Sequence, residues 1–201
     1  NIMGTNPVAA CVVFRNGRPS KNDYRHFNIK TVTGPDDFSS MEEVIFRRYR
    51  RMLDEGQPLP QLIVIDGGKG QLSSAMKSID KLNLREKITV IGIAKKLEEI
   101  YFPGDSVPIY LDKNSYSLKL IRQLRDEAHR FGINFHRRKR TSEMIKSELD
   151  RIKGIGPKTK KVLLGKFDSV DQIRNVPYAD LEKLVGRSKA SILTEYFKKR
   201  S

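Results

Sequence analysis

The residue with the clearest potential for chemistry is Asp66, which follows the apolar run Leu62–Ile65 and precedes Gly67-Gly68. The run is short, continuous and rich in β-branched residues, which predicts a buried strand. Ligands of open α/β sheets collect at the carboxyl ends of strands, so the carboxylate of Asp66 is expected to emerge where a ligand would bind. An Asp-Gly pair also favours turns, and Asp66 as a plain turn residue is the alternative interpretation.

The glycines after Asp66 do not form a nucleotide-binding loop. A P-loop needs a fixed glycine spacing before its Lys, followed by a Ser or Thr hydroxyl for magnesium. Here that spacing is missing, and Gly70 stands directly after Lys69, where the hydroxyl would be. The sequence therefore predicts no nucleotide cofactor.

His129 is the histidine best placed for proton transfer. On a helix predicted over residues 115–131 it lies on the polar face, together with two arginines and Asp126. A histidine there is a candidate general base, although a surface histidine beside a carboxylate can equally be inert. The other two histidines are weaker candidates, because His26 alternates on a predicted strand and His136 lies within a basic run.

A second kind of site is predicted at Gly154-Ile155-Gly156, between two predicted helices, the second of which opens at Pro157. This is the helix-hairpin-helix pattern. Its glycines let the backbone approach closely, while amides at the new helix start form an anion site for one DNA phosphate. The hairpin thus selects phosphate geometry and not base sequence. Three lysines add attraction to the flanking backbone: Lys158, Lys160 and Lys161.

A less complete copy of the pattern follows at Gly186-Arg187-Ser188, ahead of another amphipathic helix. Ser188 stands at the position of the second glycine. The second hairpin therefore either binds phosphate through Gly186 or has a purely structural role. For both hairpins, glycines that merely cap helices are the alternative.

The charge balance supports a polyanionic partner. The 201 residues include 39 Lys and Arg against 24 Asp and Glu, a formal charge of +15 at pH 7. Residues 146–201 alone hold 14 basic and 7 acidic side chains, which makes the C-terminal quarter the more basic part. No stretch is apolar enough for a membrane span, and the single Cys11 excludes an intrachain disulfide. We expect a cytoplasmic protein with no membrane contact.

The order of elements predicts a mixed α/β domain followed by a small helical one. A hairpin is expected over residues 8–30 with a turn at Asn16-Gly17, and a second hairpin over 101–111. A helix over 40–54 would start with a capping box of Ser40 and Glu43. The remaining expected elements are a strand at 62–65, a helix over about 72–82, a strand over 88–94 and the helix over 115–131. The basic run 136–140 is interpreted as a solvated connector or the frayed end of a helix. We therefore predict two domains, 1–142 and 143–201.

Taken together, these segments resemble the C-terminal half of the UvrC family. The resemblance rests on 62–72, 91–95 and 121–131, followed in the same order by the tandem hairpins, and covers essentially the whole chain. It implies an RNase H-like endonuclease domain, with a mixed sheet and flanking helices, joined to an all-α tandem helix-hairpin-helix domain. It implies metal-dependent cutting of the damaged strand 5′ of a lesion in bacterial nucleotide excision repair.

The resemblance also assigns site residues. Asp66 resembles the family's strand-end catalytic aspartate and would hold Mg²⁺ or Mn²⁺, and His129 resembles its closing-helix histidine. Asp37 resembles a further acid implicated in 5′ incision, with a structural contribution as the alternative. Lys69 and Lys95 are candidates for phosphate contacts, against solvated surface lysines.

The chain also departs from the family pattern. In the family another catalytic aspartate, on the first strand of the sheet, stands a few residues ahead of the segment matching Asn1–Gly4. We therefore expect a fragment with that first strand truncated, and partners of the family to be damaged DNA and UvrB, with UvrA acting upstream. A non-catalytic DNA-binding repair module on an RNase H-like scaffold is the alternative function.

Overall fold

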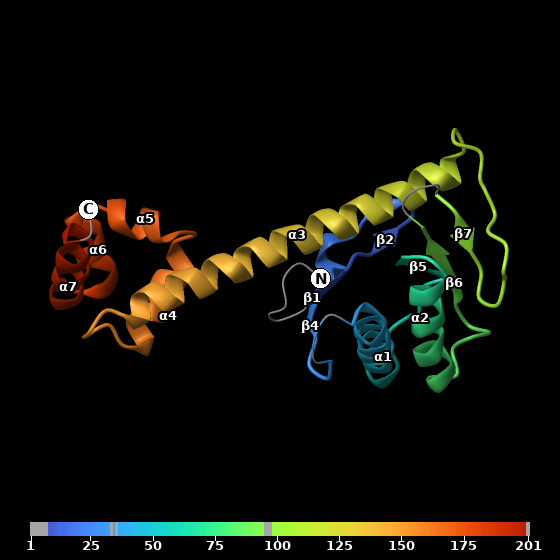
Figure 1. Cartoon of the computed structure of the whole chain (residues 1–201), viewed down its shortest axis with the longest axis horizontal. Coiled ribbons are helices and arrows are strands. Elements are labelled where there is room, and N and C mark those ends of the chain that lie inside the picture. The colour runs from blue at the N-terminus through green and yellow to red at the C-terminus, as the bar shows by residue number, and fades with distance from the viewer. Residues whose placement is uncertain (1–7, 33, 35, 95–97, 200–201) are drawn as a thin grey trace. The chain divides into compact units, whose positions relative to one another are not determined.

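The computed structural model describes residues 8–32, 34, 36–94 and 98–199, and the chain divides into two compact units, 1–133 and 134–201 (Figure 1). The helix α3 (Tyr116–Asp150) belongs partly to each unit, so the boundary expected at 142/143 falls inside it. None of the described helices is long and apolar enough to cross a lipid bilayer.

The first unit begins with the expected hairpin. Strands β1 (Val8–Cys11) and β4 (Arg25–Asn28) pair in antiparallel register. The long connection between them contains a smaller hairpin, because Asn16 and Gly17 have φ angles of 50° and 73° and form the two-residue turn that such residues favour. The elements of this connection are β2 (Phe14–Arg15), β3 (Arg18–Pro19) and the short 3-10 helix η1 (Lys21–Asp23).

The sheet that carries Asp66 is mixed, as predicted. Strand β5 (Leu62–Asp66) pairs in parallel with β6 (Thr89–Ile93), which pairs in antiparallel with β7 (Ile100–Tyr101). Helix α2 (Lys69–Lys81) makes the crossover between β5 and β6. Helices α1 (Asp37–Asp54) and α2 pack with these strands around one apolar cluster, and this packing positions the end of β5.

The start of α1 differs from the prediction, and the capping box was wrong. The helix begins at Asp37, and the side chain of Asp36 accepts hydrogen bonds from the amides of Phe38 and Ser39, each at 3.0 Å. Ser40 instead lies in the first turn, where its hydroxyl donates to the carbonyl of Asp36. Asp is as good an N-cap as Ser, and this one comes first along the chain.

Glu43, which the capping box would have used, is recruited by the segment before α1. Its carboxylate accepts hydrogen bonds from the amides of Lys30 and Thr31 and from the Thr31 hydroxyl, at 2.7–3.0 Å, and pairs with Arg47 at 2.6 Å. Burial raises the pKa of Glu43, but the hydrogen bonds from Thr31, Lys30 and Arg47 outweigh it and lower this pKa to about 2. The carboxylate therefore ties α1 to the chain before it.

We expect Glu43→Gln to lower the free energy of unfolding by about 2 kcal/mol at pH 7. Because the pKa of Glu43 is depressed from 4.5 to about 2 in the folded protein, its contribution is fully present above about pH 4.5 and is lost as the pH falls through 2. Urea titrations at pH 7 and pH 2.5 measure this difference. The control, Glu55→Gln, removes an exposed pair with Arg51 and should cost less than about 0.5 kcal/mol. Equal losses for Glu43→Gln and Glu55→Gln would contradict the tether.

Helix α3 is longer than predicted. It was expected to end near residue 131, but it continues to Asp150 and includes the basic run at 136–140. No proline interrupts this stretch, and its Arg, Lys, Glu and Met residues are good helix formers. Its apolar residues also serve both units: Leu118 and Ile121 are buried in the first, and Ile145 and Leu149 in the second. Burial beyond the basic run explains why the helix does not stop at it.

The second unit is all helical, as predicted. Residues from the end of α3 form one apolar core with the four helices that follow, and its fully buried members include Leu149, Leu163 and Leu193. The helices are α4 (Pro157–Lys166), α5 (Val170–Asn175), α6 (Tyr178–Val185) and α7 (Arg187–Lys198).

Candidate functional site

Asp66 is the last residue of β5, and its Cα lies opposite Ile93 at the end of β6. Its position at the carboxyl end of a strand is therefore as predicted. Its Oδ1 atom is buried and has no hydrogen-bond partner among the described residues. A buried carboxylate oxygen without a donor is costly, so this atom needs a partner that the described residues do not supply. A divalent cation bound by oxygen ligands fits this atom.

The turn after Asp66 is held by close backbone contacts. The amide of Gly67 donates to the carbonyls of Ile65 and Ile93, at 2.9 and 3.0 Å. A Cβ on Gly92 would lie 2.8 Å from the Gly67 carbonyl oxygen, and a Cβ on Gly70 would lie 2.5 Å from Phe38 Cε1. Gly92 is thus needed for close approach rather than for an unusual backbone angle, whereas the ring of Phe38, which is exposed, could move away from a Cβ on Gly70. Sequence reasoning missed this role, because the contacting residues are distant in the sequence.

The contact between Phe38 and Gly70 also places the start of α1 beside the start of α2. Asp37, the first residue of α1, is exposed and adjoins Phe38. The beginnings of two helices therefore lie near the end of β5, and helix starts favour negative charge. Lys69, at the first position of α2, donates to the carbonyl of Ser106 and lies with Nζ 5.4 Å from the centre of the Tyr101 ring.

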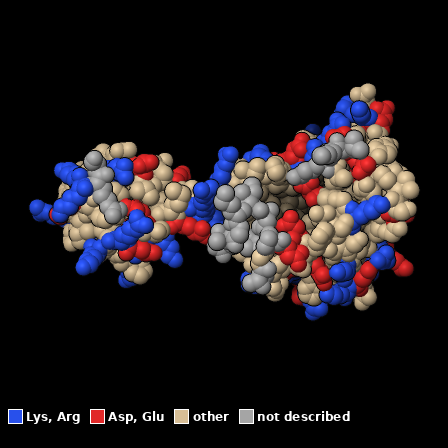
Figure 2. All heavy atoms as spheres, viewed as in Figure 1, with Lys and Arg blue, Asp and Glu red and all other residues tan. Residues whose placement is uncertain are grey.

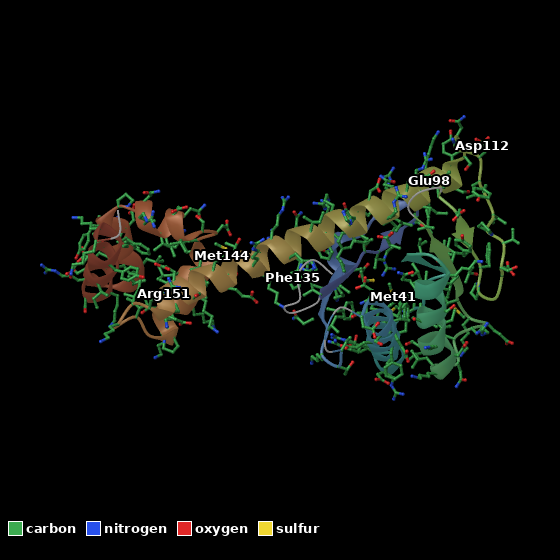
Figure 3. The ribbon with its side chains drawn as sticks, viewed as in Figure 1. Met41, Glu98, Asp112, Phe135, Met144 and Arg151 are labelled. Carbon is green, nitrogen blue, oxygen red and sulfur yellow. The ribbon has the colours of Figure 1, made fainter. Side chains whose placement is uncertain are left out.

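His129 is exposed on α3, but its predicted neighbour Asp126 is engaged elsewhere. Asp126 pairs with Arg125 at 3.0 Å. Arg122, on the same helix, forms a two-pronged ion pair with Glu98, and the hydrogen bond from Arg122 lowers the pKa of Glu98. Figure 3 shows Glu98 beside the first turns of α3. Glu98 thus anchors α3 to the chain after β6, and no sequence signal singles it out.

The described residues do not gather three or more His, Cys, Asp or Glu side chains in a group that could hold a metal ion. Asp66, Asp37 and His129 are all described, so the three do not form one such group. Their catalytic roles stay predictions, as does the phosphate contact of Lys69. Lys95 and the segment Asn1–Gly4 lie outside the described residues.

The first hairpin of the second unit has the geometry of an anion site. Gly154 has a φ of 91°, which favours glycine, and Gly156 is the N-cap of α4 with Pro157 at the first helical position. The amides at the start of α4 therefore face outward beside Lys158, which is exposed. Lys161 is exposed as well.

Lys160 differs from its neighbours. Its ammonium pairs with Asp150 at 2.5 Å, and its side chain is only 21% exposed. The ion pair joins the last residue of α3 to α4 across the hairpin, so Lys160 contributes to the shape of the hairpin in the absence of a ligand.

The second hairpin is tighter than the first. Gly186, with a φ of 82°, ends α6 and is at once the N-cap of α7, so a single residue connects the two helices. Ser188, which replaces the second glycine, lies inside α7. The connection satisfies its own backbone, since the amide of Gly186 donates to Glu182 and its carbonyl accepts from Ala190.

Comparison with known proteins matches both units. Residues 1–133 match the UvrC RNase H endonuclease domain, and residues 146–199 match a SAM-like helix-hairpin-helix tandem. The chain is 61% identical over 199 residues to UvrABC system protein C of Flavobacterium psychrophilum, and 61% identical over 198 residues to that of Flavobacterium johnsoniae. It is 59% identical over 200 residues to that of Porphyromonas gingivalis. These matches cover 98–100% of the chain and 33% of each relative, so the chain spans about a third of their length.

Proposed function

Because the chain belongs to the UvrC family, we propose that it supplies the nuclease centre and a DNA-binding domain of a nucleotide-excision-repair endonuclease. This endonuclease would cut the damaged strand 5′ of the lesion. The observation that carries this proposal is the buried, unpartnered Oδ1 of Asp66 at the end of β5. A bound cation would satisfy this oxygen, and a strand-end carboxylate that holds a metal ion is what a hydrolytic centre requires.

The chemistry divides between the residues as follows. Asp66 would hold Mg²⁺ or Mn²⁺, which when bound neutralises charge on the phosphate oxygens and makes a water nucleophilic. Asp66 itself supplies an oxygen that needs no rearrangement, because no donor has to be displaced from it. His129 is the proposed acceptor of the water proton, and its exposure on α3 leaves the imidazole accessible to substrate. Asp37 is proposed as an additional acid beside the same strand end.

The second unit would hold the DNA backbone. The amides at the start of α4 would donate hydrogen bonds to one phosphate, and the exposed Lys158 and Lys161 would attract the neighbouring phosphates. Binding of this kind is independent of base sequence, as a repair enzyme that meets lesions anywhere requires. Damaged DNA is the proposed substrate. UvrB is the proposed partner, with UvrA upstream, because the relatives are named as components of the UvrABC system.

One observation favours the second candidate, a non-catalytic DNA-binding module. The part of the chain that the structure describes holds no three-residue group suited to a metal ion. A module of this kind would use the first unit for docking only.

An incision assay separates the two. We define the full-length hybrid as the Flavobacterium johnsoniae relative with its matching third replaced by this chain. With UvrA, UvrB and a lesion-bearing duplex, we expect the full-length hybrid to cut 5′ of the lesion with Mg²⁺ or Mn²⁺, to lose at least about 10³-fold in rate with EDTA, and to recover when metal is restored. Gel analysis of end-labelled strands measures both the position and the rate. DNA binding without 5′ incision at any metal concentration would establish the non-catalytic module instead.

A further inference from the structure

The middle of α3 carries an unusual concentration of positive charge. Between Glu127 and Glu143 the helix contains five basic residues and no acidic one. Within this stretch Arg137, Arg138 and Arg140 are exposed, and none of them has an ion-pair or hydrogen-bond partner among the described residues. We call these three residues the α3 arginine cluster. Figure 2 shows Lys and Arg side chains gathered on this part of the helix.

Several other exposed arginines are paired with an acid of the protein. Arg50 and Arg51 pair with acids one turn further along α1, at 2.9 and 2.5 Å, and Arg85 pairs with Asp80 at 2.7 Å. Further examples are Arg15, Arg130 and Arg151. Arg18 and Arg187 are exposed without an ion pair among the described residues, so what distinguishes α3 is three such arginines within four residues.

This arrangement opposes helix stability. Arg137 and Arg140 are three residues apart and lie on one face of the helix, where like charges destabilise by about 0.2–0.5 kcal/mol per pair. The helix nevertheless continues through the cluster, because residues beyond it are buried in the second core. The guanidinium groups are thus held on a regular scaffold, close together and without a counter-charge.

We propose that the α3 arginine cluster is a further DNA-backbone contact, separate from the two hairpins, which binds successive phosphates of duplex DNA. Guanidinium forks match the geometry of phosphate oxygens, and DNA offers the closely spaced negative charges that the cluster lacks within the protein. Neighbouring small polar residues, Asn134, Thr141 and Ser142, leave no broad apolar face for insertion into lipid. The inference rests on the proposed DNA-binding function and extends it to the middle of α3, outside both hairpins.

The test replaces Arg137, Arg138 and Arg140 with Ala in the 201-residue chain. Fluorescence anisotropy measures duplex affinity at salt concentrations between about 50 and 200 mM NaCl, a range over which the loss of phosphate contacts changes affinity strongly. We expect affinity at about 100 mM salt to fall at least tenfold, and the slope of log K against log salt to decrease by about 2–3, since each lost phosphate contact removes about 0.9. Unchanged helix content by circular dichroism confirms that α3 persists.

The matched control replaces Arg50, Arg51 and Arg85 with Ala. It removes the same charge from side chains that are 56–72% exposed but already paired, and should change affinity less than about twofold. Equal losses in the two triple variants would overturn the proposal in favour of a general charge effect. Loss of binding to anionic lipid vesicles with unchanged DNA affinity would reassign the cluster to a membrane surface.

A Lys158→Glu variant tells the failure of this inference from the failure of the proposed function. If Lys158→Glu weakens duplex binding while the α3 triple variant does not, the hairpin binds DNA and the cluster does not. If the unaltered chain shows no salt-dependent duplex binding, the proposed DNA-binding function fails together with the inference.

Discussion

Asp66→Asn should abolish incision by the full-length hybrid, with a loss of at least about 10³-fold, while affinity for duplex DNA stays within about twofold. The carboxylate oxygen lies at the end of β5 with no hydrogen-bond donor among the described residues, and the proposed function requires it to bind a cation. An amide of the same shape binds divalent cations far more weakly. The proposed hairpin and arginine contacts to DNA lie in the second unit and on α3, so we expect a change in β5 to leave them unaffected.

The stability of Asp66→Asn gives an independent reading. An unsatisfied buried carboxylate costs about 1–3 kcal/mol, so removal of its charge should leave the free energy of unfolding of the 201-residue chain unchanged or raise it by about 1 kcal/mol. Asp105→Asn, in the exposed turn after β7, is the matched control and should leave incision intact. Full incision by Asp66→Asn, or a large loss of stability, would show that Asp66 is only a turn residue and that the centre lies elsewhere.

Gly92→Ala is expected to cause the largest loss of stability, about 3 kcal/mol, and to abolish incision as well. The added Cβ would meet the Gly67 carbonyl oxygen at 2.8 Å and Leu72 Cβ at 3.3 Å. The first of these is backbone and is fixed by the hydrogen bond from the Gly67 amide to Ile93, so β6 must move away from the turn that carries Asp66.

The control for Gly92→Ala lies in the same turn. Gly68 has an ordinary φ of −80°, and nothing lies within 4 Å of an added Cβ, so Gly68→Ala should cost less than about 1 kcal/mol. Urea titrations give the free energies, and hydrogen exchange at the Gly67 amide reports whether the turn has moved. Similar losses in the two variants would mean that the glycines are needed for backbone freedom and not for close packing.

Much of the first unit follows from apolar pattern alone. Strands β5 and β6 were predicted because short β-branched runs between turn residues have few alternatives. The pairing of β1 with β4 was predicted from two apolar segments around Asn16-Gly17, which forms the turn between β2 and β3. The errors came where several local solutions are equally good. Asp36 and Ser40 are both suitable N-caps for α1. The capping box would also have needed Glu43, but its carboxylate instead accepts hydrogen bonds from Lys30 and Thr31, which precede the helix.

The candidate site also contains features that could be predicted from the sequence and features that could not. The strand-end position of Asp66 could be predicted, since it depends only on where an apolar run stops. The approach of Phe38 to Gly70 and the pairing of Arg122 with Glu98 could not, because each depends on how elements distant in the sequence pack together. The end of α3 was misjudged because a run of like charges suggests a break, whereas burial of Leu149 beyond the run maintains the helix.

The ion pair of Lys160 with Asp150 has a consequence for how long DNA stays bound. A phosphate that binds Lys160 would compete with Asp150 for the ammonium, so we expect it to gain less from Lys160 than from an unpaired lysine. Once displaced, the Asp150 carboxylate stands close to the phosphate and can reclaim the ammonium as the strand moves away. We therefore expect competition within the hairpin to shorten the residence time on DNA more than it slows encounter.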